Sequence, residues 1–200
     1  VTVGVGCDGM GGPGGGKLAS ELAVETFLAV CRERLRADMS ARNVQTVAES
    51  AVQEANAVIY RRACSDRLWG MGTTLVSAIA WDRQALVSNV GDSRAYRIPA
   101  AGGIARITKD HSFVERLVER GDITAEEARI HPNRNLITRA LGPDADTQLL
   151  SDSYLVQLEP GDYLLLCTDG LVGTVTDREM EREVLRGGGD SCLNRLLEIA

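Results

Sequence analysis

Two similar segments of the chain each end in an aspartate that could bind a metal ion. Residues 3–9 (VGVGCDG) and 164–170 (LLLCTDG) are apolar runs that close on Asp-Gly, at Asp8 and at Asp169. A strand end holds a carboxylate rigidly, and the glycine after it lets a backbone carbonyl approach a metal shell. If the two strands are neighbours, Asp8 and Asp169 face each other as a hard oxygen site suited to Mg²⁺ or Mn²⁺. The alternative is that each Asp-Gly pair is simple turn chemistry.

Two more aspartates lie near predicted strands, Asp110 just after strand-like sequence and Asp92 inside it. Asp110 could be a metal ligand or the N-cap of a helix that starts at Phe113, and on the residues alone capping is the better interpretation. Asp92 and Arg94 lie two positions apart, so we expect them to satisfy each other or the backbone in a structural role.

Other kinds of catalytic or binding site find less support. The chain has two histidines, His111 and His131, and neither lies beside an obvious nucleophile that it could activate. Residues 11–18 (GGPGGGKL) nearly match a phosphate-binding loop, but Leu18 replaces the hydroxyl residue that holds Mg²⁺. A phosphate-binding loop also belongs to folds in which β-strands and α-helices alternate, whereas the strands here suggest antiparallel hairpins.

Hydrophobic periodicity predicts the elements that must position these residues. Helical spacing predicts helices from about Leu18 to Arg36 and over 44–59, and a last helix from near Ser191. Thr176 is a good N-cap for another helix that runs to about Arg186, with Glu179 in the capping-box position. Apolar runs predict strands at 1–7, 73–81, 85–90, 96–98, 104–107, 149–158 and 162–167.

The order of these elements indicates an α+β fold. Hairpin connections give antiparallel sheets, and two such sheets packed face to face with helices outside would bury this pattern. The polar segment from His111 to about Asn135 is expected to form a small helical surface subdomain. We see no repeat and no interdomain linker, so residues 1–200 are expected to form a single domain.

Composition limits the classes of function. The formal net charge is −6 and the pI about 5.0, with no basic stripe, which argues against nucleic-acid binding. An acidic surface repels phosphate, so a phosphate-handling site would need cations to offset the charge. No segment is apolar enough to span a membrane or act as a signal peptide, and five unpaired-looking cysteines suggest reduced, mostly buried thiols in a cytoplasmic protein.

Seven segments, taken in order, resemble the bacterial metal-dependent serine/threonine phosphatases of the PP2C type. They are residues 8–12 (DGMGG), 72–75 (GTTL), 89–96 (NVGDSRAY), 108–112 (TKDHS), 131–132 (HP), 137–142 (ITRALG) and 160–171 (PGDYLLLCTDGL). One segment alone would be weak evidence, but the ordered set spans nearly the whole chain and is specific.

The resemblance implies a fold and a site. The fold is a β-sandwich of two antiparallel sheets flanked by helices, with a mobile flap that corresponds to about 112–135. Asp8 matches the carboxylate that bridges two catalytic metal ions, and Gly9 matches the residue whose carbonyl joins the shell. Asp169 matches another ligand of the catalytic pair, and Asp110 matches a ligand of a third, weaker ion.

The resemblance also implies a reaction. Two Mn²⁺ or Mg²⁺ ions, with a possible third, would activate a water that hydrolyses phosphoserine and phosphothreonine in proteins without a covalent enzyme intermediate. The expected partners are phosphorylated proteins, namely a cognate serine/threonine kinase and its substrates. We expect a monomer without nucleic-acid partners.

Departures from the family pattern keep alternatives open. Pro13 stands where bacterial relatives usually have histidine, and Lys17 stands where they usually have glutamate. The family's first strand, which carries a phosphate-binding arginine, would precede Val1, and a final metal-binding aspartate would follow Ala200. The alternatives are an inactive piece, a pseudophosphatase that serves as a binding module, and a regulatory domain of a larger signalling protein.

Overall fold

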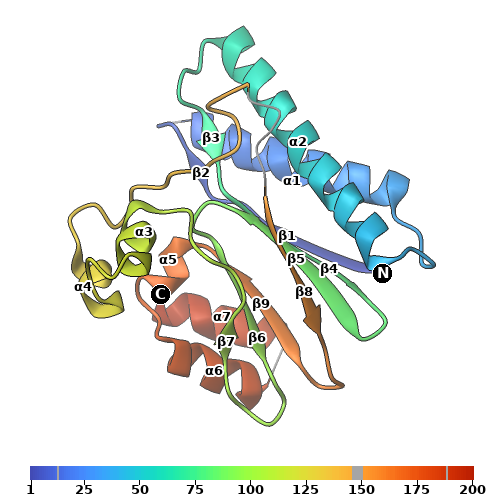
Figure 1. Ribbon diagram of the computed structural model, residues 1–200, viewed down its shortest axis with the longest axis vertical. Coiled ribbons are helices and arrows are strands. Elements are labelled where there is room, and N and C mark those ends of the chain that lie inside the picture. Colours follow the sequence, from blue (N-terminus) through green and yellow to red (C-terminus); the bar gives the residue numbers. More distant parts are fainter. Residues whose placement is uncertain (13, 146–150, 188) are drawn as a thin grey trace.

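Two antiparallel sheets pack face to face at the centre of the molecule (Figure 1). The computed structural model describes residues 1–12, 14–145, 151–187 and 189–200. The first sheet has the strand order β1-β4-β5-β8, and the second has the order β7-β6-β9. The strands of the two sheets are β1 (Thr2–Gly6), β4 (Leu75–Trp81), β5 (Gln84–Val90), β6 (Arg94–Ile98), β7 (Ala105–Arg106), β8 (Asp152–Gln157) and β9 (Tyr163–Cys167).

A tight hairpin and a short strand pair fix how the strands of the first sheet align. Trp81 pairs with Gln84, so a two-residue turn joins β4 to β5. A separate pair of short strands, β2 (Gly9–Met10) and β3 (Gly72–Thr73), lies beside the first sheet. Every strand pairing among the described residues is antiparallel, which contradicts the parallel units that a nucleotide-binding loop requires.

Helices cover the outer faces of both sheets (Figure 1). The pair α1 (Gly15–Arg34) and α2 (Ala41–Asp66) covers the first sheet, and the pair α6 (Asp177–Arg186) and α7 (Asp190–Ile199) covers the second. The short helices α3 (Phe113–Glu119), α4 (Ala125–Ile130) and α5 (Asp169–Val172) lie at one end of the sandwich. The predicted layers of helix, sheet, sheet and helix are therefore confirmed.

Three apolar cores hold these four layers together. Phe27 and Ile59 pack with Ile79 between the first helix pair and its sheet. Val76 and Val87 belong to a core of small and branched side chains between the two sheets. Tyr96, Ile98, Met180 and Leu196 belong to the third core, under α6 and α7. Burying such side chains contributes roughly 1.5–3 kcal/mol each, so the layers depend on one another.

Several local expectations can be checked directly. Thr176 and Glu179 form the predicted capping box at the start of α6. The N-cap of α3 is Ser112, whose hydroxyl accepts a hydrogen bond from the Glu115 backbone N–H, so the interpretation of Asp110 as the cap is wrong. The five thiols are free, and three of them are buried. Among the described residues, no helix combines the length and apolar character that a membrane crossing needs.

We expect a glycine substitution to show how tightly α2 packs on the β3 region. Gly142 has φ +99°, and a Cβ there would lie 2.3 Å from Cγ2 of Ile59, whereas Gly103 has φ +96° with open space around it. Gly103→Ala should lower the free energy of unfolding by about 1–2 kcal/mol through backbone strain. Gly142→Ala should cost a further 1–3 kcal/mol or so through overpacking. Urea unfolding measures both, and equal losses would contradict this packing.

Candidate metal centre

Asp8 and Asp169 meet where the two sheets converge. Asp8 follows β1 in the first sheet, and Asp169 follows β9 in the second. The two sheets are in contact, since a Cβ on Gly4 would lie 3.4 Å from Cδ1 of Leu166. The Asp8 carboxyl is within hydrogen-bonding reach of Asp169. The expected pair is therefore brought together, although its members face each other across the sandwich and not as neighbours in one sheet.

Backbone and hydroxyl contacts hold Asp8 in place. Its N–H donates to Oγ1 of Thr74 at 3.0 Å, and its carbonyl accepts from the Thr74 N–H and from the Thr73 hydroxyl, both at 2.9 Å. The Thr74 hydroxyl also lies 2.7 Å from the Ser93 hydroxyl in a fully buried contact. Residues 72–75 (GTTL), which lie beside Asp8, therefore fix the position of its backbone.

Gly9 is required by a close backbone crossing. A Cβ on this residue would lie 1.9 Å from the carbonyl oxygen of Gly16, in the first turn of α1. The Gly9 N–H also donates to the Asp8 carboxylate, which favours the charged form of that group. This crossing explains why α1 begins at Gly15, earlier than its hydrophobic pattern predicted. The role of the Gly9 carbonyl as a metal ligand stays a prediction.

Like charges gather at this point of the molecule. Burial, together with the hydrogen bond and charge of Asp169, raises the pKa of Asp8 to about 6. Burial and the nearby charges of Asp169, Asp110 and Asp8 raise the pKa of Asp92 to about 6 as well. Among the described residues, no lysine or arginine forms an ion pair with Asp8, Asp92 or Asp169. We name these three residues the acidic cluster.

Asp92 is the member of the acidic cluster that the sequence analysis missed. We expected Arg94 or the backbone to satisfy it. The Arg94 guanidinium pairs with Asp110 instead, whereas a backbone N–H does hydrogen-bond to the Asp92 carboxylate. Asp92 directly follows the end of β5 and its turn glycine, just as Asp8 and Asp169 follow their strands. That shared position at a strand end was the available signal.

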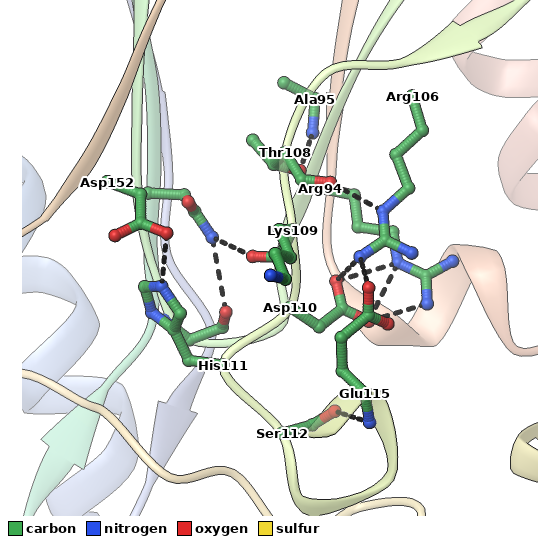
Figure 2. A network of polar contacts seen from close by, with 12 residues as sticks. Arg94, Ala95, Arg106, Thr108, Lys109, Asp110, His111, Ser112, Glu115 and Asp152 are labelled. Atoms are coloured by element: carbon green, nitrogen blue, oxygen red, sulfur yellow. Dashed lines mark hydrogen bonds and ion pairs between the residues drawn. The ribbon is translucent and has the colours of Figure 1, made fainter. Parts of the chain in front are cut away.

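Asp110 is held by two arginines (Figure 2). Its carboxylate lies 2.7 Å from Nη2 of Arg94 and 2.8 Å from Nη2 of Arg106, and Glu115 lies 3.3 Å from the same Arg106 group. Although burial opposes the charge of Arg94, the hydrogen bonds and charge of Asp110 raise the pKa of that guanidinium. A metal ion at Asp110 would compete with both arginines, so this assignment remains a prediction.

The histidines have structural contacts. Nδ1 of His111 accepts a hydrogen bond from the Gly91 N–H at 3.1 Å, so the neutral ring carries its proton on Nε2, which lies 3.1 Å from Asp152 (Figure 2). Burial lowers the pKa of His111, and Asp152 opposes that shift. Nδ1 of His131 accepts from the Asn133 N–H at 3.1 Å. His111 therefore ties the segment after Asp110 to the turn that carries Asp92.

The donor set suits a hard divalent cation. Within the described ranges, no three His, Cys, Asp or Glu side chains are gathered into a complete metal centre. Mg²⁺, however, is usually held by only one or two carboxylates and keeps several of its waters. Asp8 and Asp169 supply two carboxylates that repel each other and have no cationic partner among the described side chains. A divalent ion would relieve that repulsion, so these residues fit such a group.

We expect Thr74→Val to loosen Asp8. The substitution keeps the shape of the side chain but leaves the Asp8 N–H and the Ser93 hydroxyl without their partner, which should cost about 1–3 kcal/mol of unfolding free energy. Ser77→Ala is a matched control, because the Ser77 hydroxyl is buried without a hydrogen-bond partner in the described structure and its loss should be nearly neutral. Urea unfolding compares the two, and a loss for Thr74→Val no greater than the control would contradict the assignment.

Of the two unusual residues near the Gly-rich loop, the structure describes only Lys17. Lys17 lies on the exposed side of α1 and pairs with Glu21 at 3.8 Å. Pro13 lies outside the described residues.

Comparisons with known proteins place this geometry in a family. A sequence model of the family described as protein phosphatase 2C matches residues 3–191. The chain is 40% identical over 180 residues to serine/threonine phosphatase stp of Listeria innocua, covering 90% of this chain and 69% of that protein.

Solved structures agree with the sequence comparison. The serine/threonine phosphatase PstP/Ppp of Mycobacterium tuberculosis superposes with a TM-score of 0.87 at 31% identity, over 98% of this chain and 80% of that one. The catalytic domain of a serine/threonine protein phosphatase PstP, solved in complex with two manganese ions, superposes with a TM-score of 0.83 at 30% identity, over 98% of this chain and 80% of that one. Since the family match covers nearly the whole chain, this protein belongs to the protein phosphatase 2C family.

Proposed function

We propose that this chain hydrolyses phosphoserine and phosphothreonine esters in proteins, with two divalent ions, Mn²⁺ or Mg²⁺, as cofactors. The observation that carries the proposal is the pair of carboxylates, Asp8 and Asp169, that two different sheets hold within reach of each other without a cationic partner among the described residues. The serine/threonine phosphatases to which the chain is similar, one of them solved with two manganese ions, support it.

In this proposal Asp8, Asp169 and the Gly9 carbonyl would hold the two ions. Asp92 would join them because it lies in the same acidic cluster, while Asp110 would serve a third ion only by giving up its arginine contacts. When bound, the ions would supply Lewis-acid stabilisation of the phosphoryl oxygens and a water of lowered pKa.

The protein's own contribution is to hold the carboxylates of Asp8 and Asp169 in fixed positions. Thr73 and Thr74 fix the backbone of Asp8, and Thr168 precedes Asp169 at the start of α5. Because the acidic cluster repels a phosphate when it lacks cations, a phosphoryl group would bind there only in the metal-loaded protein. The two histidines take no part as bases, since each has its own structural partners.

The wider role follows from the substrate class. The substrates would be phosphorylated proteins, among them a cognate serine/threonine kinase and its targets. Residues 1–200 would act as one domain, with residues of about 112–135 as a flap-like subdomain beside the site. The pseudophosphatase alternative is less well supported, because Asp8 and Asp169 lie within reach of each other and the exposed Lys17 pairs with Glu21.

We expect Asp8→Asn and Asp169→Asn each to lower Mn²⁺-dependent hydrolysis of a phosphothreonine peptide by about 10²-fold or more. Each substitution removes a carboxylate whose bound ion is worth several kcal/mol in the transition state, and about 1.4 kcal/mol is tenfold in rate. The readout is kcat/KM with and without Mn²⁺.

Asp38→Asn is the matched control, because Asp38 is an exposed aspartate outside the site. It should leave the rate unchanged. Full activity in a site variant, or equal activity without any divalent ion, would sink the two-metal assignment.

A further inference from the structure

A cleft runs from the acidic cluster to the flap. It has a volume of about 380 Å³, within the range of small-ligand sites. Asp92 and Asp169 line it, together with residues of α3 and α4. Val114, Val118 and Val172 add apolar side chains to the lining.

The flap wall is held at its base. Ser112 and Ile137 form an antiparallel bridge, and the Phe113 N–H donates to the Leu136 carbonyl at 2.8 Å. Arg106 reaches Glu115 on α3 at 3.3 Å. The segment that carries α3 and α4 therefore begins and ends at one anchored point, which sets the wall beside the acidic cluster.

The cations that line this cleft are of two kinds. Arg94 and Arg106 are neutralised by Asp110 and Glu115. Arg129, at the end of α4, and Arg134, just beyond it, make no side-chain hydrogen bond or ion pair with any described residue. Arg129 and Arg134 therefore line the cleft without a partner anion among the described residues.

We propose that Arg129 and Arg134 bind a second anionic group on the substrate, carried close to the residue that is dephosphorylated. Arginine suits this task because its planar fork binds a carboxylate or a phosphate through two hydrogen bonds. The partner is a phosphopeptide with a flanking anion, either an acidic side chain or a second phosphoresidue. This inference rests on the proposed function, since the acidic cluster must take the first phosphate.

The charge of the whole protein gives this pair more weight. With a net charge of −6, the surface repels an anionic peptide at long range. Arg129 and Arg134 would offset that repulsion at the cleft and favour peptides whose second anion reaches the flap. Selectivity of this kind weakens as salt screens the charges.

The test compares phosphothreonine peptides in the presence of Mn²⁺. One peptide has neutral flanks, a second series carries glutamate at successive flanking positions, and a third carries a second phosphothreonine at those positions. The proteins are the wild type, the double variant Arg129→Gln/Arg134→Gln, and the control Arg116→Gln. Arg116 is an exposed flap arginine that lies outside the cleft and has no side-chain partner among the described residues.

We expect the wild type to prefer the best anion-flanked peptide by about tenfold in kcat/KM, the effect of one charge-assisted hydrogen bond. The double variant should lose this preference while its rate on the neutral peptide stays within about twofold, and Arg116→Gln should keep it. Comparison of the glutamate and phosphothreonine series shows whether the two arginines bind a carboxylate or a phosphate.

A second readout separates this inference from the proposed function. Binding of fluorescent phosphonate analogues of the same peptides, measured by anisotropy, should show the same loss in the double variant. If the wild type hydrolyses the neutral peptide but shows no anion preference, the inference fails and the function stands. If no peptide is hydrolysed and the anisotropy preference is absent as well, both fail. An anion preference that survives in the double variant would also overturn the inference.

Discussion

Electrostatic repulsion between Asp8 and Asp169 is the constraint around which this molecule is arranged. Burial, together with the hydrogen bond and charge of Asp169, raises the pKa of Asp8 to about 6, and Asp92 adds a third charge nearby. A flexible chain would separate them. The sandwich prevents this, because β1 and β9 belong to different sheets that share an apolar core, so moving one aspartate away would disrupt that core. The fold therefore holds a charge arrangement that a divalent cation stabilises.

The surroundings of the acidic cluster divide the remaining polar groups by task. Hydroxyl groups of Thr73, Thr74 and Ser93 hold the backbone and carry no charge. Asp110 and Glu115 neutralise the arginines nearest the cluster, which keeps those cations from occupying the carboxylates themselves (Figure 2). Only the flap presents unpaired guanidinium groups in the cleft among the described residues. The cleft therefore combines members of the acidic cluster, paired arginines and, on the flap, arginines without a partner among the described residues.

The features that could be predicted from the sequence are those determined by residues close together in the chain. The capping box at Thr176 and Glu179 needs four consecutive residues, and it formed as expected. The four layers followed from periodicity and hairpin chemistry. The early start of α1 could not be predicted, because it depends on Gly16 packing against Gly9. Likewise, Arg94 pairs with Asp110, which lies 16 residues further along the chain. Arg94 is therefore not the partner of Asp92 that we expected. Sequence periodicity does not predict which side chains the topology of the fold brings into contact.

The most direct test of the central claim is a crystal structure of this chain grown with Mn²⁺, read at the manganese absorption edge. Our interpretation predicts two anomalous peaks about 3.5–4 Å apart, bonded to carboxylate oxygens of Asp8 and Asp169. The same crystals of Asp8→Asn should show weaker peaks or none at this position. Carboxylates of Asp8 and Asp169 that stay in contact with each other, with manganese absent or bound elsewhere, would contradict it.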